Sequence, residues 1–177
     1  MTQDKSLIKL LKHPKNIGIK VKSWRNSQLE TILQIRELLE TSDTIILEGP
    51  TGVGKSIIAA ATILSNQDMS NGVILTSTKQ LQEQYVHDVE DAVTIMGRNN
   101  FNCRIVSGLD CSYNPCSITT TANNDSGEEN DGDGVEPCEY VKAKRKAIRA
   151  RLAVLTYAYY LPEANFVGGF RNRTFQV

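Results

Sequence analysis

The residues of this sequence best suited to chemistry form one glycine-rich segment, GPTGVGKS. The segment satisfies the complete pattern G-x-x-x-x-G-K-[ST], in which backbone N–H groups turn inward toward phosphate oxygens. The lysine of such a segment neutralises the β- and γ-phosphates, and the hydroxyl ligates Mg²⁺. We therefore predict a site for ATP and Mg²⁺, with Lys55 and Ser56 as the catalytic residues. The expected nucleotide contacts here are Gly49, Pro50, Thr51, Gly52, Val53, Gly54, Lys55 and Ser56.

Apolar segments on both sides place this loop between a strand and a helix. The run Thr44–Glu48 predicts a buried parallel strand, and a helix rich in Ala and Ile follows over about 55–65. A second strand over 72–76 and a second helix over 79–92 repeat the order. This alternation predicts an α/β fold with a parallel sheet flanked by helices. It also favours a nucleotide site over a glycine-rich structural turn.

The flanking segments are less regular. Residues 1–22 are basic and predict either an extension or a first strand. Ser27 and Glu30 have the spacing of a capping box, which predicts that a helix starts at Ser27. Further along the chain the pattern predicts a helix over 141–152 and strands over 153–156 and 174–177.

Composition limits the class of protein. The chain has 177 residues, of which 40% are hydrophobic, and this suits one compact domain. The net charge is zero, which excludes attraction of the chain as a whole to nucleic acid or membranes. No apolar run is long enough to span a membrane, and the N-terminus lacks the pattern of a signal peptide. We therefore expect a cytoplasmic protein (nuclear in a eukaryote) with reduced cysteines.

The four cysteines gather in one polar stretch of the sequence. Their spacing is C-x7-C-x4-C-x21-C, and the long gap contains the acidic run 123–137, which predicts a loop. Four thiolates are a common ligand set for a 4Fe–4S cluster or a structural Zn²⁺ ion. From the spacing alone, a metal centre and metal-free thiols or disulfides all remain open. The candidate ligands are Cys103, Cys111, Cys116 and Cys138.

Segments outside the phosphate loop add a resemblance to a known family. Arg25-Asn26-Ser27-Gln28 precedes the loop, Thr76-Ser77-Thr78 and Gln84 follow it, and Ala153–Leu161 comes after the cysteines. With these segments the chain resembles the iron–sulfur superfamily 2 DNA helicases of the XPD and DinG type, over about residues 22–177. The resemblance implies a RecA-like P-loop NTPase fold with a four-cysteine iron–sulfur insertion. The implied order is an extension (1–22), motor domain 1 (23–94), the insertion (95–140) and a return to motor domain 1 (141–177).

The resemblance also implies roles for particular residues. Gln28, with Arg25, would read the adenine edge, and the four cysteines would hold the 4Fe–4S cluster, with Zn²⁺ as the alternative. Each such role has a plainer alternative: a solvated helix terminus for Gln28, a strand end for Thr76–Thr78, and a solvated face for the basic helix. The residues implied to contact DNA are Thr76, Ser77, Thr78, Gln84, Lys142, Arg145 and Arg149.

One expected part of such a motor is missing from the sequence. No acidic residue follows Glu163, so no DEAH-type box supplies the carboxylate that holds Mg²⁺ and positions water. The chain therefore resembles the N-terminal part of a helicase, which binds ATP and hydrolyses it poorly alone. The expected partners are single-stranded or forked DNA and the second motor domain. We expect the chain to be monomeric. The alternatives are a catalytically inactive P-loop module and a zinc-bearing protein that binds nucleic acid.

Overall fold

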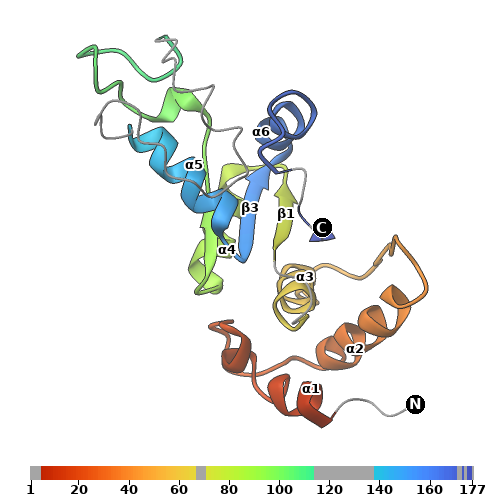
Figure 1. Cartoon of the computed structure of the whole chain (residues 1–177). Coiled ribbons are helices and arrows are strands. Elements are labelled where there is room, and N and C mark those ends of the chain that lie inside the picture. Colours follow the sequence, from red (N-terminus) through yellow and green to blue (C-terminus); the bar gives the residue numbers. More distant parts are fainter. Residues whose placement is uncertain (1–4, 67–70, 114–137, 171–172, 174, 177) are drawn as a thin grey trace.

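The computed structural model describes residues 5–66, 71–113, 138–170, 173 and 175–176 (Figure 1). The acidic run 123–137 and Cys116 lie outside this part of the chain. The α-helices are α1 (Lys5–Leu10), α2 (Gln28–Leu39), α3 (Lys55–Leu64), α4 (Lys79–Asp88), α5 (Glu139–Arg149) and α6 (Tyr157–Pro162). The strands are β1 (Gly72–Thr76), β2 (Ala92–Thr94), β3 (Leu152–Thr156) and β4 (Phe175–Gln176). Shorter turns of helix are η1 (Pro14–Ile17), η2 (Arg98–Asn100) and the π-helical turn η4 (Glu163–Val167).

The four strands form one parallel sheet in the order β2-β3-β1-β4. The central pair is the longest, with β1 running from Gly72 opposite Leu152 to Thr76 opposite Thr156. Helices connect the strands, as parallel pairing requires. The predicted α/β class with a parallel sheet flanked by helices is therefore confirmed, and so are the predicted helix at 55–65 and the strands at 72–76 and 153–156.

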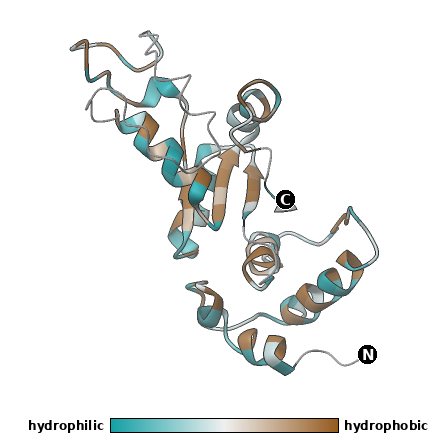
Figure 2. Cartoon of the chain, in the orientation of Figure 1, coloured by the Kyte–Doolittle hydropathy of each residue, from teal (hydrophilic) through white to brown (hydrophobic). Residues whose placement is uncertain are grey.

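Apolar side chains alternate between the two faces of the sheet and build two cores. Ile74 and Val154 belong to a core shared with α3 and α4, whereas Val73 and Leu155 belong to a core shared with α5 and α6. Successive side chains of a strand point to opposite faces, so neighbouring residues in one strand serve different cores. Figure 2 shows the central strands β1 and β3 as mostly hydrophobic, as expected for a sheet covered on both sides.

The N-terminal segment contains short helices from Lys5 onward and contributes to the core. The sequence predicted either an extension or a first strand for residues 1–22. The described residues 5–22 contain α1 and η1, and their only β-pairing is an isolated bridge between Ile19 and Val89. Leu11, Ile17 and Ile19 are buried, and the Trp24 indole N–H donates to the Leu11 carbonyl at 2.6 Å. This segment and α2 form an outer layer, with α3 between that layer and the sheet (Figure 1).

The strand predicted at Thr44–Glu48 is wrong. These residues form no regular secondary structure, and Ile46 is 92% exposed. A parallel strand needs a neighbour with which to exchange backbone hydrogen bonds. Beside β1 that place is taken by β4, which has only 2 residues, and no strand among the described residues pairs with 44–48. An apolar run predicts a buried strand only where a neighbouring strand is available to pair with it.

The predicted start of a helix at Ser27 is confirmed, whereas the predicted helix ends at 92 and at 152 are wrong, since α4 ends at Asp88 and α5 at Arg149. Ser27 precedes α2, but it lies in the left-handed region (φ 66°) and makes no side-chain cap, so the capping box with Glu30 does not form. Its hydroxyl donates to the Asn26 carbonyl instead. The helix predicted over 79–92 ends at Asp88, because residues 92–94 form the short strand β2, which pairs with β3.

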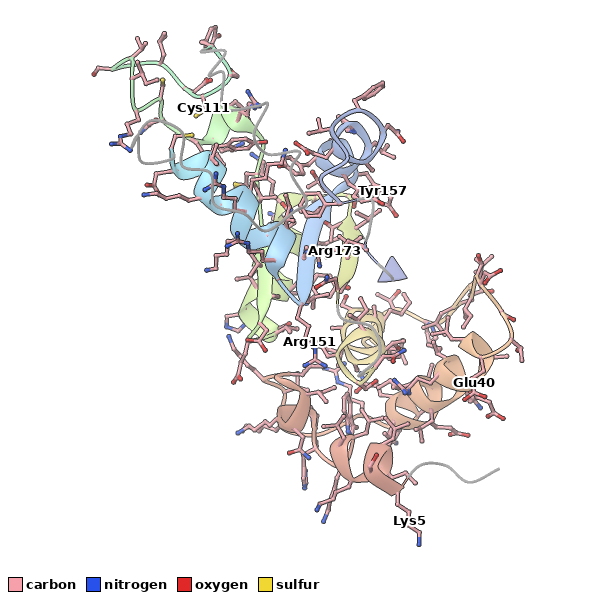
Figure 3. The ribbon with its side chains drawn as sticks, viewed as in Figure 1. Lys5, Glu40, Cys111, Arg151, Tyr157 and Arg173 are labelled. Atoms are coloured by element: carbon pink, nitrogen blue, oxygen red, sulfur yellow. The ribbon has the colours of Figure 1, made fainter. Side chains whose placement is uncertain are left out.

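Arg173 ties the end of α5 to the sheet. Its guanidinium donates to the carbonyls of Ala147, Ile148 and Ala150 near the end of α5, and to the Gly72 carbonyl at the start of β1. A cation at a helix C-terminus satisfies carbonyls that have no partner within the helix. Burial lowers the pKa of Arg173 to about 10. Figure 3 shows Arg173 beside the sheet. No described helix is long and apolar enough to cross a membrane.

Candidate nucleotide-binding site

A hollow of about 720 Å³ opens at the start of α3, where the glycine-rich loop meets two other segments. The loop and α3 contribute Thr51, Gly52, Gly54, Lys55, Ser56 and Ile57 to its lining. The segment before α2 contributes Arg25, α2 contributes its first residue Gln28, and α4 contributes Gln84 and Asp88. The structure thus brings together side chains that are far apart in the sequence around the residues predicted to bind phosphate.

The backbone of the loop needs glycine at two places. Gly52 and Gly54 both have φ 86°, a conformation that other residues adopt only with strain. A Cβ at Gly54 would also lie 2.3 Å from Gln28 Nε2, so the close approach of α2 requires glycine there. Gly54 precedes Lys55, the first residue of α3, and the N–H groups at a helix N-terminus attract anions. This local structure agrees with the phosphate-loop prediction.

Lys55 lies over the loop. Its ammonium donates to the carbonyls of Gly49 at 2.8 Å and Pro50 at 3.2 Å. Both contacts are exposed to solvent, so a phosphate group can replace these carbonyls as the acceptor without leaving a buried polar atom unpaired.

Gln28 and Arg25 bind the loop itself. Gln28 is 2% exposed, and its amide N–H₂ donates to the Val53 carbonyl at 2.8 Å. Its side-chain oxygen accepts from the Arg25 backbone N–H at 2.9 Å, and the Arg25 guanidinium donates to the Gly52 carbonyl at 2.6 Å. The structure therefore places both predicted adenine-reading residues at the hollow, where they also hold the loop in place.

Helix α4 supplies a wall of the hollow that the sequence analysis assigned differently. Gln84, predicted to contact DNA, lines the hollow with the loop residues. Asp88 lines it one helical turn later, and Tyr85 between them is buried in the core that α4 shares with α3. Sequence reasoning missed Asp88. The i, i+4 spacing of Gln84 and Asp88 was the available signal that they share a face.

The predicted DNA-contacting triplet lies where β1 ends. Thr76 is buried, and its hydroxyl donates to the carbonyls of Thr78 and Leu155. Ser77 is exposed, and the Thr78 hydroxyl caps α4 by accepting from the Leu81 N–H at 3.3 Å. Ligands of open parallel sheets bind outside the carboxyl ends of the strands, which is where this triplet lies.

The described cysteines lie on the α5 side of the sheet. Cys111 Sγ and Cys138 Sγ are 3.9 Å apart, and the Val106 N–H donates to Cys103 Sγ. Two thiolates on one tetrahedral Zn²⁺, with Zn–S bonds of about 2.3 Å, would have sulfurs about 3.8 Å apart. The Cys111–Cys138 pair fits that spacing, but no group of three or more metal-ligating side chains forms within the described residues. Figure 3 shows Cys111 at the end of the molecule remote from α2.

The basic helix α5 divides its charges between the core and the surface. Lys144 is buried in an ion pair with Glu163 at 2.7 Å, and Lys142 pairs with Glu139 at 3.1 Å. Arg145 and Arg149 are exposed. Of the three residues predicted to contact DNA on this helix, two therefore present their charge to solvent.

Comparison with known proteins identifies the family. A family model described as the type III restriction enzyme, res subunit, matches residues 21–133, which is more than half of the chain. The match includes the loop, the segment before α2 and all of α4. Comparisons with curated proteins and with solved structures give no match. The chain therefore belongs to the type III restriction enzyme res subunit family, a group of superfamily 2 helicase-type ATPase domains.

Proposed function

We propose that this chain binds Mg·ATP in the hollow at the start of α3, as the nucleotide-binding part of a DNA helicase. The observation that carries the proposal is the convergence on one hollow of Lys55, Ser56, Arg25 and Gln28 from two separate segments. A glycine-rich structural turn explains the loop conformation but gives no reason for a lysine, a hydroxyl and a glutamine to gather around it.

Each residue has a defined part in this proposal. Lys55 exchanges the Gly49 and Pro50 carbonyls for the β- and γ-phosphates, and the loop N–H groups bind the same phosphates. Ser56 would hold Mg²⁺, which neutralises phosphate charge when bound. Gln28 retains one donor and one acceptor beyond its contacts with Val53 and Arg25, which is what the adenine edge requires.

We further propose that single-stranded DNA follows the end of β1 and the exposed side of α5. Ser77 and the helix N-terminus after Thr78 offer uncharged phosphate contacts, while Arg145 and Arg149 offer charged ones. Lys142 would join them by giving up its exposed pair with Glu139. Gln84 does not share this role, because it lines the nucleotide hollow.

The cysteines support a second, separate proposal of one thiolate-bound metal centre. The support is the 3.9 Å separation of the Cys111 and Cys138 sulfurs. Cys103 and Cys116 would complete a four-thiolate set. A visible spectrum and metal content after anaerobic purification distinguish the two candidates. A brown protein with about four irons per chain indicates the 4Fe–4S cluster, and a colourless protein with one zinc indicates a zinc site. Metal-free protein after reconstitution would contradict both.

Calorimetric titration of the chain with Mg·ATP tests the main proposal. Lys55→Ala should weaken binding by about 10- to 100-fold, the effect of losing about 1.5–3 kcal/mol of charge-assisted hydrogen bonding. Lys79→Ala is the matched control, because Lys79 is an exposed lysine at a helix start that binds Asn100 and not the loop. Equal affinities of the Lys55→Ala and Lys79→Ala variants would overturn the assignment of the site.

A further inference from the structure

We propose that Asp88 accepts hydrogen bonds from the ribose hydroxyls of the bound nucleotide, so that the site prefers a ribonucleotide to a deoxyribonucleotide. The inference rests on the proposed ATP binding and deepens it, since it concerns the sugar that joins the phosphates to the adenine. It gives the end of α4 a direct part in nucleotide binding.

The hollow has room for a whole nucleotide and not only for its phosphates. Its volume of about 720 Å³ lies within the range of about 300–1,000 Å³ that is usual for small-molecule sites. The loop and the start of α3 form the part of the lining that suits phosphate. The rest of the lining comes from the segment that runs from Val21 to Gln28, and from Gln84 and Asp88 of α4. A nucleotide with its phosphates at the loop must place its nucleoside along these residues.

Backbone contacts fix the end of α4 beside the segment that leads to Arg25. The Lys20 N–H donates to the Asp88 carbonyl at 2.8 Å, and next to this contact Ile19 and Val89 form an antiparallel bridge. Asp88 therefore borders the hollow together with the segment that carries Arg25. Among the described residues, no hydrogen bond or ion pair links the Asp88 side chain to the phosphate loop.

The carboxylate of Asp88 is available to a ligand. The side chain is 27% exposed, and Oδ1 lies 2.8 Å from Nδ1 of His87, whose own side chain is exposed. The described residues give Oδ2 no hydrogen-bond partner. Gln84 lies one turn earlier on the same face of α4 and brings an amide that can both donate and accept.

The charge of Asp88 indicates which part of the nucleotide it contacts. Among the described residues that line the hollow, Asp88 is the one acid. A carboxylate only accepts hydrogen bonds and repels phosphate, whereas the 2′- and 3′-hydroxyls of ribose are donors. Carboxylates bind ribose hydroxyls in this way in the dinucleotide sites of other α/β proteins. The sugar is therefore the part of the nucleotide that matches Asp88.

The place of Asp88 in its helix favours a role in binding over a role in stability. Asp88 is the last residue of α4, where the helix carbonyls carry a partial negative charge. A negative side chain is unfavourable there, and residues that break a local rule of this kind are expected mainly at functional sites. Replacement of Asp88 should therefore leave the fold intact, which makes the inference testable by substitution.

Calorimetric titrations with Mg·ATP and with Mg·dATP, which lacks only the 2′-hydroxyl, test the inference. The unchanged chain should bind Mg·ATP about 10-fold more tightly than Mg·dATP, the effect of one hydrogen bond to a charged group. Asp88→Ala should bring the ratio of the two affinities close to one. Glu83→Ala is the matched control, because Glu83 is an exposed acid of α4 that does not line the hollow. It should keep the ratio of the unchanged chain.

The possible results separate the inference from the proposed function. Equal affinities of the unchanged chain for the two nucleotides, or the same ratio in Asp88→Ala as in the unchanged chain, would overturn the inference and leave ATP binding standing. Failure of the unchanged chain to bind either nucleotide would overturn both. If Asp88→Ala does not fold, Asp88→Asn decides in its place. It keeps the shape of the side chain and should lower the ratio about 3-fold, because a neutral acceptor forms a weaker hydrogen bond.

Discussion

The two faces of the sheet use their polar side chains in opposite ways. On the face covered by α3 and α4, Lys55 donates to loop carbonyls in contacts exposed to solvent. On the face covered by α5 and α6, Lys144 is paired with Glu163, and these side chains are only 8% and 10% exposed. A ligand can take over the first kind of contact but not the second. The difference suggests that the first face is arranged for exchange with a ligand and the second for stability.

The buried pair is part of a larger polar network. The Tyr140 hydroxyl lies 3.1 Å from the Tyr159 hydroxyl and donates to Glu163, and the Arg98 guanidinium lies 5.1 Å from the centre of the Tyr140 ring. The network connects α5 with α6, η4 and the segment that leads to Cys103. Its members hold the region of the cysteines against the sheet.

The largest expected effect comes from breaking this network. Lys144→Ala leaves Glu163 buried without its cation and should lower the free energy of unfolding by about 3–5 kcal/mol. Lys142→Ala, on the same helix, removes an exposed pair and should lower it by no more than about 1 kcal/mol. Urea unfolding followed by circular dichroism measures both. Similar losses in the two variants would contradict the distinction between the buried ion pair of Lys144 and the solvent-exposed pair of Lys142.

An intermediate effect is expected from the two glycines of the loop. Gly52→Ala and Gly54→Ala each place a side chain in the left-handed region, at a cost of about 1–2 kcal/mol. Only at Gly54 does the new Cβ meet Gln28 Nε2, and loss of the Gln28–Val53 hydrogen bond adds about 1–3 kcal/mol. Thermal unfolding and ATP titration should therefore rank Gly54→Ala as the more harmful. The reverse order would contradict the proposed role of Gln28 in holding the loop.

The smallest expected effect concerns alkaline pH. The pKa of Tyr159 is raised by burial, by Tyr140 and by Glu163, and the pKa of Tyr85 is raised by burial. Unfolded tyrosine loses its proton near pH 10 while these folded tyrosines keep theirs, so stability should fall as pH rises above about 10. Tyr159→Phe should flatten this decline more than Tyr85→Phe, since Tyr140 and Glu163 add to the effect of burial at Tyr159. Urea unfolding between pH 9 and 11 measures the slopes, and a steeper decline in Tyr159→Phe would contradict the account.

Local sequence patterns were sufficient for the elements around the loop. The phosphate pattern predicted the start of α3 at Lys55, and the apolar runs predicted at 72–76 and 153–156 pair with each other as central strands. These features depend on residues close together in the sequence. The sheet order and the pairing of the short strand β2 with β3 depend on distant residues and were not predicted.

The errors have physical reasons of the same kind. Thr44–Glu48 is apolar enough for a buried strand, yet a strand also needs a paired neighbour, which no local pattern reveals. Lys144 is indistinguishable in sequence from the other cations of its helix, and only the position of Glu163 on η4 buries it.

The central claim is that ATP binds at the loop, and hydrogen exchange of backbone amides with and without Mg·ATP tests it most directly. The account predicts slower exchange in peptides that contain Gly49–Ser56 and the start of α2, with no change in peptides from α5. Loop N–H groups that turn toward phosphate must become protected when it binds. Protection confined to other segments, or no protection at saturating Mg·ATP, would contradict the claim.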